Sequence, residues 1–236
     1  MLDEGQLERV RDEFTSLLRG IEREGSDIDG LLAWMDSHGF FTSPATTQYH
    51  CSFDGGLALH SLNVYKSLCN LAGEYACNRE TVLPARLDDN GNVLPPLVKE
   101  TPRYGKDTLL IVGLLHGLGK AGLYEKYSRN EKDYSKYGKS KDALGYYSWT
   151  STLGYRVVDE AKRDIYGDSG FSSYFIASGF IPLTTEESVV LANFNELLSD
   201  DKNKASMYQI LAKYPLASLL LSASVLSAYC TERPDA

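Results

Sequence analysis

A run of apolar residues near the middle of the chain, residues 109–115, most constrains the fold. The run is apolar on every side, and a helix of that composition is stable only when other elements bury it. Asp107 or Thr108 is expected to cap the start of this helix. His116 follows the run directly, and two glycines behind it mark the helix end. The sequence therefore predicts a buried helix that carries a histidine at its C-terminal end.

Other segments repeat apolar residues at the 3.6-residue spacing of amphipathic helices. His60 falls on the apolar face of one of them. A lone histidine in such a position is more often a core residue bound to a neighbouring carbonyl than a ligand. The periodicity favours a fold that is mainly all-α. The helices expected in this way span residues 2–24, 28–38, 57–75 and 155–166.

Composition limits the class of protein. A chain of 236 residues with 43% hydrophobic side chains is large enough for one sizeable core, so we expect a single domain. The net charge of -8 argues against duplex nucleic acid held on a globally basic surface. The four cysteines form no CxxC pair, and neither an apolar leader nor a membrane-length apolar segment occurs. We therefore expect a cytoplasmic protein without a membrane partner.

Two stretches lack helical periodicity. Residues 77–106 contain four prolines and an Asn-Gly pair, which predicts a long connection with a small hairpin at that pair. Residues 124–141 interleave tyrosines with basic residues, a mix that suits base stacking and phosphate contact. A solvated, twisted hairpin or loop is the favoured alternative. We expect a long irregular Tyr/Lys-rich arm, and its candidate ligand contacts are Tyr124, Lys126, Tyr127 and Arg129.

Several motifs resemble the HD-domain metal-dependent phosphohydrolases, in a form common in bacteriophages and prophages. Leu114-Leu-His-Gly-Leu-Gly-Lys120 is similar to the Leu-Leu-His-Asp-Leu-Gly-Lys motif of that family. Gly55-Gly-Leu-Ala-Leu-His-Ser-Leu62 resembles its first ligand region, and residues 180–187 and 214–229 resemble two of its later helices. The resemblance implies one HD-like helical bundle over residues 1–236. Its parts are N-terminal helices (1–40), a first half of the core (55–120), an arm or insertion (121–168) and C-terminal core helices (170–232).

The resemblance also implies a metal centre of two histidines and two aspartates that activates water against a phosphate ester. His60 and His116 stand at the two histidine positions. Gly117 and Ser224 stand where the family has its aspartates, so two oxygen ligands are lost. Two histidines alone would hold magnesium or manganese poorly, and would retain zinc, nickel or cobalt only with other donors.

Further differences indicate decay of the hydrolytic site on a retained fold. Ser169 and Phe194 fall where the resemblance places two accessory histidines, whereas His50 keeps an accessory position. Asp107 is too distant to replace a lost ligand, about 14 Å along the helix from the histidine at its other end. Asp54 is more often a cap for the following helix than a ligand. A carboxylate from elsewhere beside both core histidines would reverse this interpretation.

Three hypotheses follow for function. The first is a pseudoenzyme without catalytic residues or cofactor, whose pocket binds a phosphate-containing ligand such as a nucleotide. The second is an active phosphohydrolase with rearranged ligands and a divalent transition metal. The third is a protein that binds a host factor through its acidic surface. In the first, Lys120 binds phosphate as a point charge, although it equally suits a solvated lysine at a helix end. The pocket residues expected are His50, His60, His116 and Lys120, together with the arm residues.

Overall fold

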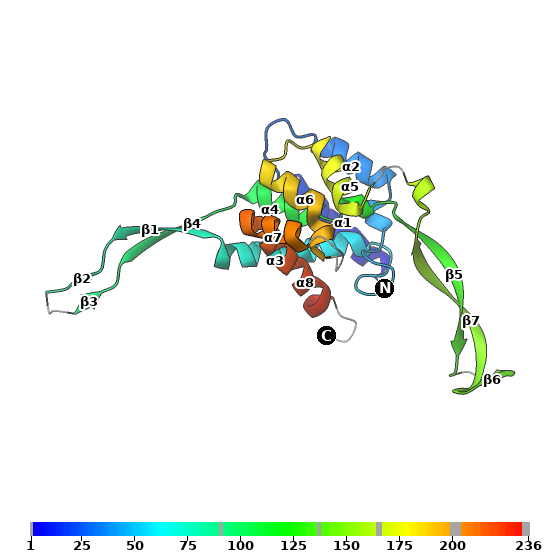
Figure 1. Ribbon diagram of the computed structural model, residues 1–236. Helices are drawn as coiled ribbons and strands as arrows, with labels where there is room; N and C mark the ends of the chain where they lie inside the picture. Colours follow the sequence, from blue (N-terminus) through cyan, green and yellow to red (C-terminus); the bar gives the residue numbers. More distant parts are fainter. Residues whose placement is uncertain (1, 90–91, 136–137, 164–166, 199–203, 233–236) are drawn as a thin grey trace.

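The apolar run at the centre of the chain forms helix α4 (Lys106–Leu115), which lies among the other helices of the body (Figure 1). Its side chains from Leu110 to Leu115 are fully buried, as predicted, whereas Leu109 at the start of the run is partly buried. Gly113 permits the close approach of the neighbouring helix, because a Cβ there would lie 2.9 Å from the Cα of Tyr65. The expected side-chain cap is wrong: Gly105 occupies the N-cap, and Asp107 accepts a hydrogen bond from the backbone of Glu22 instead.

The computed structural model describes residues 2–89, 92–135, 138–163, 167–198 and 204–232. Helix α4 divides the core into two clusters. One cluster packs α4 against the N-terminal helices and the start of α3, and the other packs it against the end of α3, α6 and α8. The remaining α-helices are α1 (Glu4–Leu18), α2 (Ile28–Ser37), α3 (Gly56–Tyr75), α5 (Ser169–Ser178), α6 (Thr185–Leu198), α7 (Lys204–Lys213) and α8 (Pro215–Leu226). Short turns of other helix types are η1 (Phe40–Thr42), η2 (Leu118–Lys120), η3 (Glu160–Lys162) and the π-helical η4 (Ser227–Thr231).

The all-α prediction is wrong, because the structure is 52% helix and 19% strand. Two hairpins project from opposite sides of the helical body (Figure 1). The first pairs β1 (Cys77–Leu83) with β4 (Leu97–Pro102), and its outer part pairs β2 (Arg86–Leu87) with β3 (Val93–Leu94). The Asn-Gly hairpin is confirmed by these strands, although residues 90–91 themselves lie outside the described residues.

The second hairpin stands where we expected a long irregular arm, and it agrees with the alternative of a solvated hairpin. Strand β5 (Tyr124–Asp133) pairs with β7 (Gly145–Val157) in unbroken antiparallel register, and β6 (Ser140–Asp142) adds to the far edge of β7. Both faces of this ribbon meet solvent, so its sequence lacks the apolar alternation of a half-buried strand. The charged residues of β5 therefore show no alternation from which a regular strand could be predicted.

Two expected helices differ from the structure. The first helix, α1, ends at Leu18 and not near residue 24. Arg19 is its C-cap residue, and a glycine follows. The helix predicted over residues 155–166 is wrong where it is described, because β7 continues to Val157 and a short turn follows. Strand pairing with β5 outweighs the local periodicity here. Residues 164–166 of that prediction lie outside the described residues.

Membrane-spanning potential is confined to one bent pair of helices. Within the described ranges, no single helix is both long and apolar enough to cross a bilayer. Residues Met207–Lys213 and Pro215–Thr231 pass the length and composition test only when they are taken together, and they meet at a bend of 110°.

A buried histidine cluster with a carboxylate from the end of the chain

Two helices bring His60 and His116 together. His60 lies in the second turn of α3, and His116 caps the C-terminus of α4. Their ring centroids are 5.4 Å apart, and both side chains are buried. The structure thus unites the two histidines that the sequence singled out, because α3 and α4 pack along each other.

A third histidine comes from the loop before α3. The ring of His50 lies 4.6 Å from that of His60, centroid to centroid. The loop is held by a hydrogen bond from the backbone N of Ala45 to the carbonyl of Cys51, and Cys51 has a left-handed φ of 45°. This carbonyl lies against the start of α3, where a Cβ on Gly56 would come 2.0 Å from it. The glycine therefore permits the approach that delivers His50.

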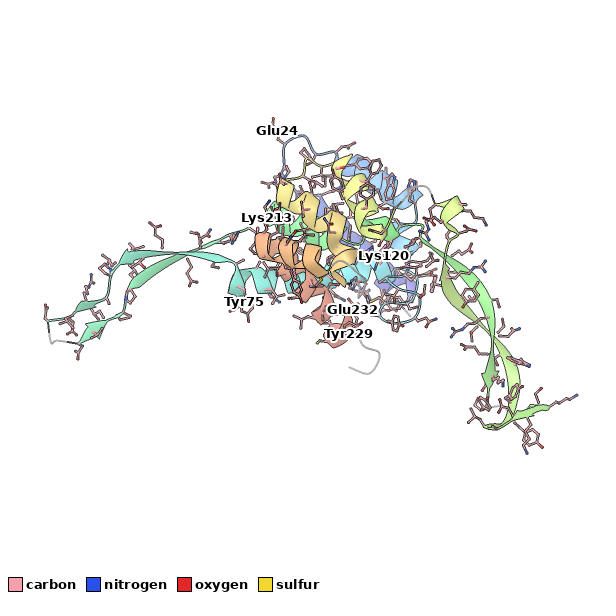
Figure 2. The ribbon with its side chains drawn as sticks, viewed as in Figure 1. Glu24, Tyr75, Lys120, Lys213, Tyr229 and Glu232 are labelled. Carbon is pink, nitrogen blue, oxygen red and sulfur yellow. The ribbon has the colours of Figure 1, made fainter. Side chains whose placement is uncertain are left out.

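Glu232 completes the cluster, and sequence reasoning missed it. It follows the π-helical turn η4 at the end of α8, and its side chain is only 2% exposed. Nδ1 of His60 donates to this carboxylate at 3.0 Å, and the side-chain amide of Asn63 donates to it at 2.9 Å. Figure 2 shows Glu232 and Lys120 in the helical body, away from both hairpin tips. A single acid beyond the last helix has no spacing pattern, so nothing in the sequence pointed to it.

The charges in this cluster are set by burial and by neighbours. Burial, and then the nearby His60, lowers the pKa of His50 to about 4, and burial holds the pKa of His116 well below its usual value. Burial would raise the pKa of Glu232, but the hydrogen bond and charge of His60 lower it overall. Burial lowers the pKa of Lys120 to about 8, against the opposing charge of Glu232. At neutral pH the cluster therefore combines neutral imidazoles at His50 and His116 with an ionised carboxylate.

Several ring nitrogens in the cluster lack partners. Nδ1 of His116 lies 2.9 Å from the carbonyl of Gly113, which can only accept, so this nitrogen carries the proton. Its Nε2 therefore presents a lone pair, and it is buried without a hydrogen-bond partner among the described residues. Both ring nitrogens of His50 are buried and unpartnered in the same way. Buried polar atoms without partners are rare and point to an absent ligand or ion.

The other positions drawn from the HD resemblance carry neither carboxylate nor imidazole. Phe194 packs edge-on against His116 with ring centroids 5.0 Å apart, and it is buried. A Cβ on Gly117 would lie 3.0 Å from a methyl group of Leu57, so apolar packing already surrounds this position. Ser224 is buried on α8. Apolar side chains therefore lie at two of these positions, Phe194 against His116 and Leu57 against Gly117.

The arm residues form a separate group on β5. The ammonium of Lys126 bonds Asp54 at 2.6 Å, and the guanidinium of Arg129 pairs with Glu131. Asp54 also accepts from the hydroxyl of Tyr155 at 2.7 Å. Asp54 is therefore neither the helix cap nor the ligand that we considered, because Gly55 occupies the N-cap of α3 and the acid ties the second hairpin to the body.

The two arm tyrosines take up different surroundings. Tyr124 lines a shallow pocket of about 300 Å³ together with Lys126 and Asp54. Tyr127 stacks under the guanidinium of Arg156 at 5.7 Å from the ring centroid. These contacts belong to the base of the hairpin, so the predicted pocket residues divide into a buried histidine cluster and a surface group.

A separate cavity of about 160 Å³ lies beside η2 and does not include the histidine cluster. Trp34 and His38 form one part of its wall, with their rings stacked 4.1 Å apart. Two cationic residues, Lys162 and Arg163, line another part, and hydroxyl groups of α5 complete it. This combination of aromatic platform and cations was not singled out by the sequence, because its members lie in four separate segments.

Comparisons of the chain with family models, with curated proteins and with solved structures found no match. The likeness to HD-domain phosphohydrolases therefore stays a prediction from the motifs.

Proposed function

We propose that the chain is a binding protein on an HD-like scaffold that does not hydrolyse phosphate esters. The observation that carries this proposal is the packing at His116. Phe194 lies edge-on against its ring, and Gly117 offers no side-chain oxygen beside it. The hydrolytic centre that the HD motifs imply would need carboxylate ligands beside this histidine and an open position for water. The class proposed is a pseudoenzyme.

The ligand proposed is a phosphate-containing molecule with an aromatic ring, such as a nucleotide. Lys120 is poorly placed to bind it, because its ammonium is partly buried and already donates to the carbonyl of Ala45 at 3.1 Å. The cavity beyond η2 suits it better, because Lys162 and Arg163 offer cations and the Trp34–His38 pair offers a stacking surface. We therefore place the phosphate at these cations and not at the histidine cluster.

A thermal-shift screen with nucleotides and inorganic phosphate tests the ligand, followed by calorimetric titration. Replacing both Lys162 and Arg163 by alanine should weaken binding by about 10-fold or more for each charged hydrogen bond lost. Lys139→Ala with Lys141→Ala is the matched control, because it removes the same charge from the tip of the second hairpin. Absence of any shift up to millimolar ligand, or an equal loss in the control, would refute the proposal.

A second candidate is the active phosphohydrolase with rearranged ligands. Glu232 favours it, because this carboxylate does bond His60. It reaches only one of the two core histidines, since Nε2 of His116 has no hydrogen-bond partner in the described residues. Turnover in a phosphatase and nucleotidase panel with manganese, nickel or cobalt, abolished by His116→Ala, would establish this candidate and eliminate the pseudoenzyme.

Two further expectations stay proposals. A cytoplasmic location is supported by the four free cysteines, which suit a reducing compartment. A host protein as partner is supported by exposed apolar side chains on the projecting hairpins. The most exposed of these are Leu87, Val93, Leu144, Trp149 and Leu153.

A further inference from the structure

We infer that His50, His60 and Glu232 form a binding site for one divalent transition metal, which fastens the end of the chain to the loop before α3. The site is separate from the cavity proposed for the phosphate ligand, and it does not rest on that proposal. It also differs from the centre implied by the HD motifs, because His60 is the one core ligand position common to the two sets, and the resemblance gives His50 an accessory position. The three residues come from a loop, a helix and the segment after η4.

The donor atoms are close to the spacing that a metal requires. One donor atom from each of the three residues lies within 4.8 Å of the other two. Ligands of a tetrahedral zinc ion lie roughly 3.4 Å apart, given bond lengths of about 2.1 Å. His60 and Glu232 are already 3.0 Å apart, nitrogen to oxygen. A movement of roughly 1 Å at His50, within the range of a side-chain rotation, would complete the set.

The surroundings of the donors favour a bound cation over an empty cluster. His50 has both ring nitrogens buried and unbonded, a state that costs free energy until a proton donor or a metal satisfies one of them. The proton that His60 shares with Glu232 is the one that a metal would displace. Asn63 donates to the carboxylate and would keep it oriented after the metal binds.

The donor set selects the kind of metal. Two imidazole nitrogens and one carboxylate oxygen suit zinc and its neighbours cobalt and nickel, whereas magnesium and calcium prefer oxygen alone. Lys120 faces the same interior and opposes a cation, but its ammonium is bonded to the carbonyl of Ala45. The ring nitrogens of His50 are buried, and the side chains of His60 and Glu232 are 3% and 2% exposed. An ion held by these donors would therefore fasten the segment after α8 in place.

The test uses the whole chain, first stripped with a chelator and then titrated with cobalt and zinc. We expect about one metal per chain, a visible cobalt spectrum typical of nitrogen and oxygen ligands, and a rise in melting temperature. The rise should be about 5–10 °C at 100-fold excess over Kd. No cobalt spectrum and no shift with zinc, cobalt or nickel would overturn the inference, and this result needs no variant.

Variants then locate the ion. His50→Ala and Glu232→Gln should each weaken binding by at least 10-fold. Glu13→Gln, which changes a surface carboxylate paired with Lys66, should leave binding unchanged. Circular dichroism of each metal-free variant checks that it folds. If His116→Ala abolishes binding while His50→Ala and Glu232→Gln retain it, the ion lies at the position implied by the HD motifs and the inference is wrong. Failure of the nucleotide screen would leave these results untouched.

Discussion

The ion pair between Arg23 and Glu187 links the loop after α1 to the first turn of α6, and its removal is the most demanding test of the fold. The guanidinium binds both carboxylate oxygens, at 2.5 and 2.8 Å. Glu187 is fully buried, and Arg23 is 19% exposed. The same carboxylate accepts from the backbone N of Thr184 at 2.8 Å, so it also closes the capping box of α6. We therefore choose Arg23→Ala, which leaves this carboxylate buried without its cation.

The structure sets the magnitude of the expected loss in the free energy of unfolding. Removing one partner of a buried ion pair costs about 3–5 kcal/mol. The Thr184 N–H bond remains in the variant and continues to stabilise the charge, which places the expected loss near the lower limit. We expect the free energy of unfolding to fall by about 3 kcal/mol and the melting temperature by about 6–12 °C. Glu187→Gln should cost less, about 1–3 kcal/mol, because it removes the buried charge as well as the pair.

The pH dependence of the free energy of unfolding gives a second test of the same ion pair. Burial would raise the pKa of Glu187, but the hydrogen bond from Arg23 and that from Thr184 lower it overall. In the native chain this group therefore stabilises the fold above its ordinary pKa, and the stabilisation is lost as the pH falls below that value. In Arg23→Ala burial dominates and the pKa of Glu187 rises. The difference between variant and native chain should therefore be largest at neutral pH and should shrink toward about pH 4.

Urea denaturation at several pH values measures both effects. Arg11→Ala is the matched control, because Arg11 pairs with Asp36 on the surface with both side chains about half exposed. Such a pair contributes about 1 kcal/mol or less. If Arg23→Ala destabilises the chain no more than Arg11→Ala does, or if the difference does not shrink in acid, the stabilising role assigned to the buried pair is wrong.

Three other substitutions test the packing around the site. Gly119→Ala should destabilise the chain by about 1–3 kcal/mol, because its Cβ would lie 2.2 Å from the carbonyl of Ser169, whereas Gly73→Ala meets nothing within 4 Å and should be neutral or stabilising. Thermal melts of the pair would show this, and equal effects would contradict it. Phe194→Ala should cost about 3–5 kcal/mol in denaturant unfolding, and a loss under 1 kcal/mol would mean that this ring does not fill the core. Asp54→Ala should speed hydrogen exchange at the base of the second hairpin, since two bonds to it are lost, while unchanged exchange would show that the acid does not anchor the hairpin.

The histidines show how much of the site can be predicted from the local spacing of apolar residues. His60 could be placed inward because its helix has one apolar face, and His116 because it follows a run that must be buried. Local pattern does not show that the two histidines meet, which follows from the packing of α3 against α4. Glu232 carries no such signal, because it lies 172 residues from His60 and reaches the histidine only through the path of α8 and η4.

Residue pattern was enough to predict the buried central helix, the amphipathic helices α2 and α3 and most of α1, and the inward position of His60 and His116. These features depend on which side of a helix is apolar, and the spacing of apolar residues within one segment shows that side. Only the folded chain fixes the length and register of the two strand ribbons, the separation of the arm residues from the histidines, and the contact of Glu232 with His60. Those outcomes depend on contacts between distant segments, and a ribbon with both faces in water or a lone terminal acid leaves no periodic trace in the chain.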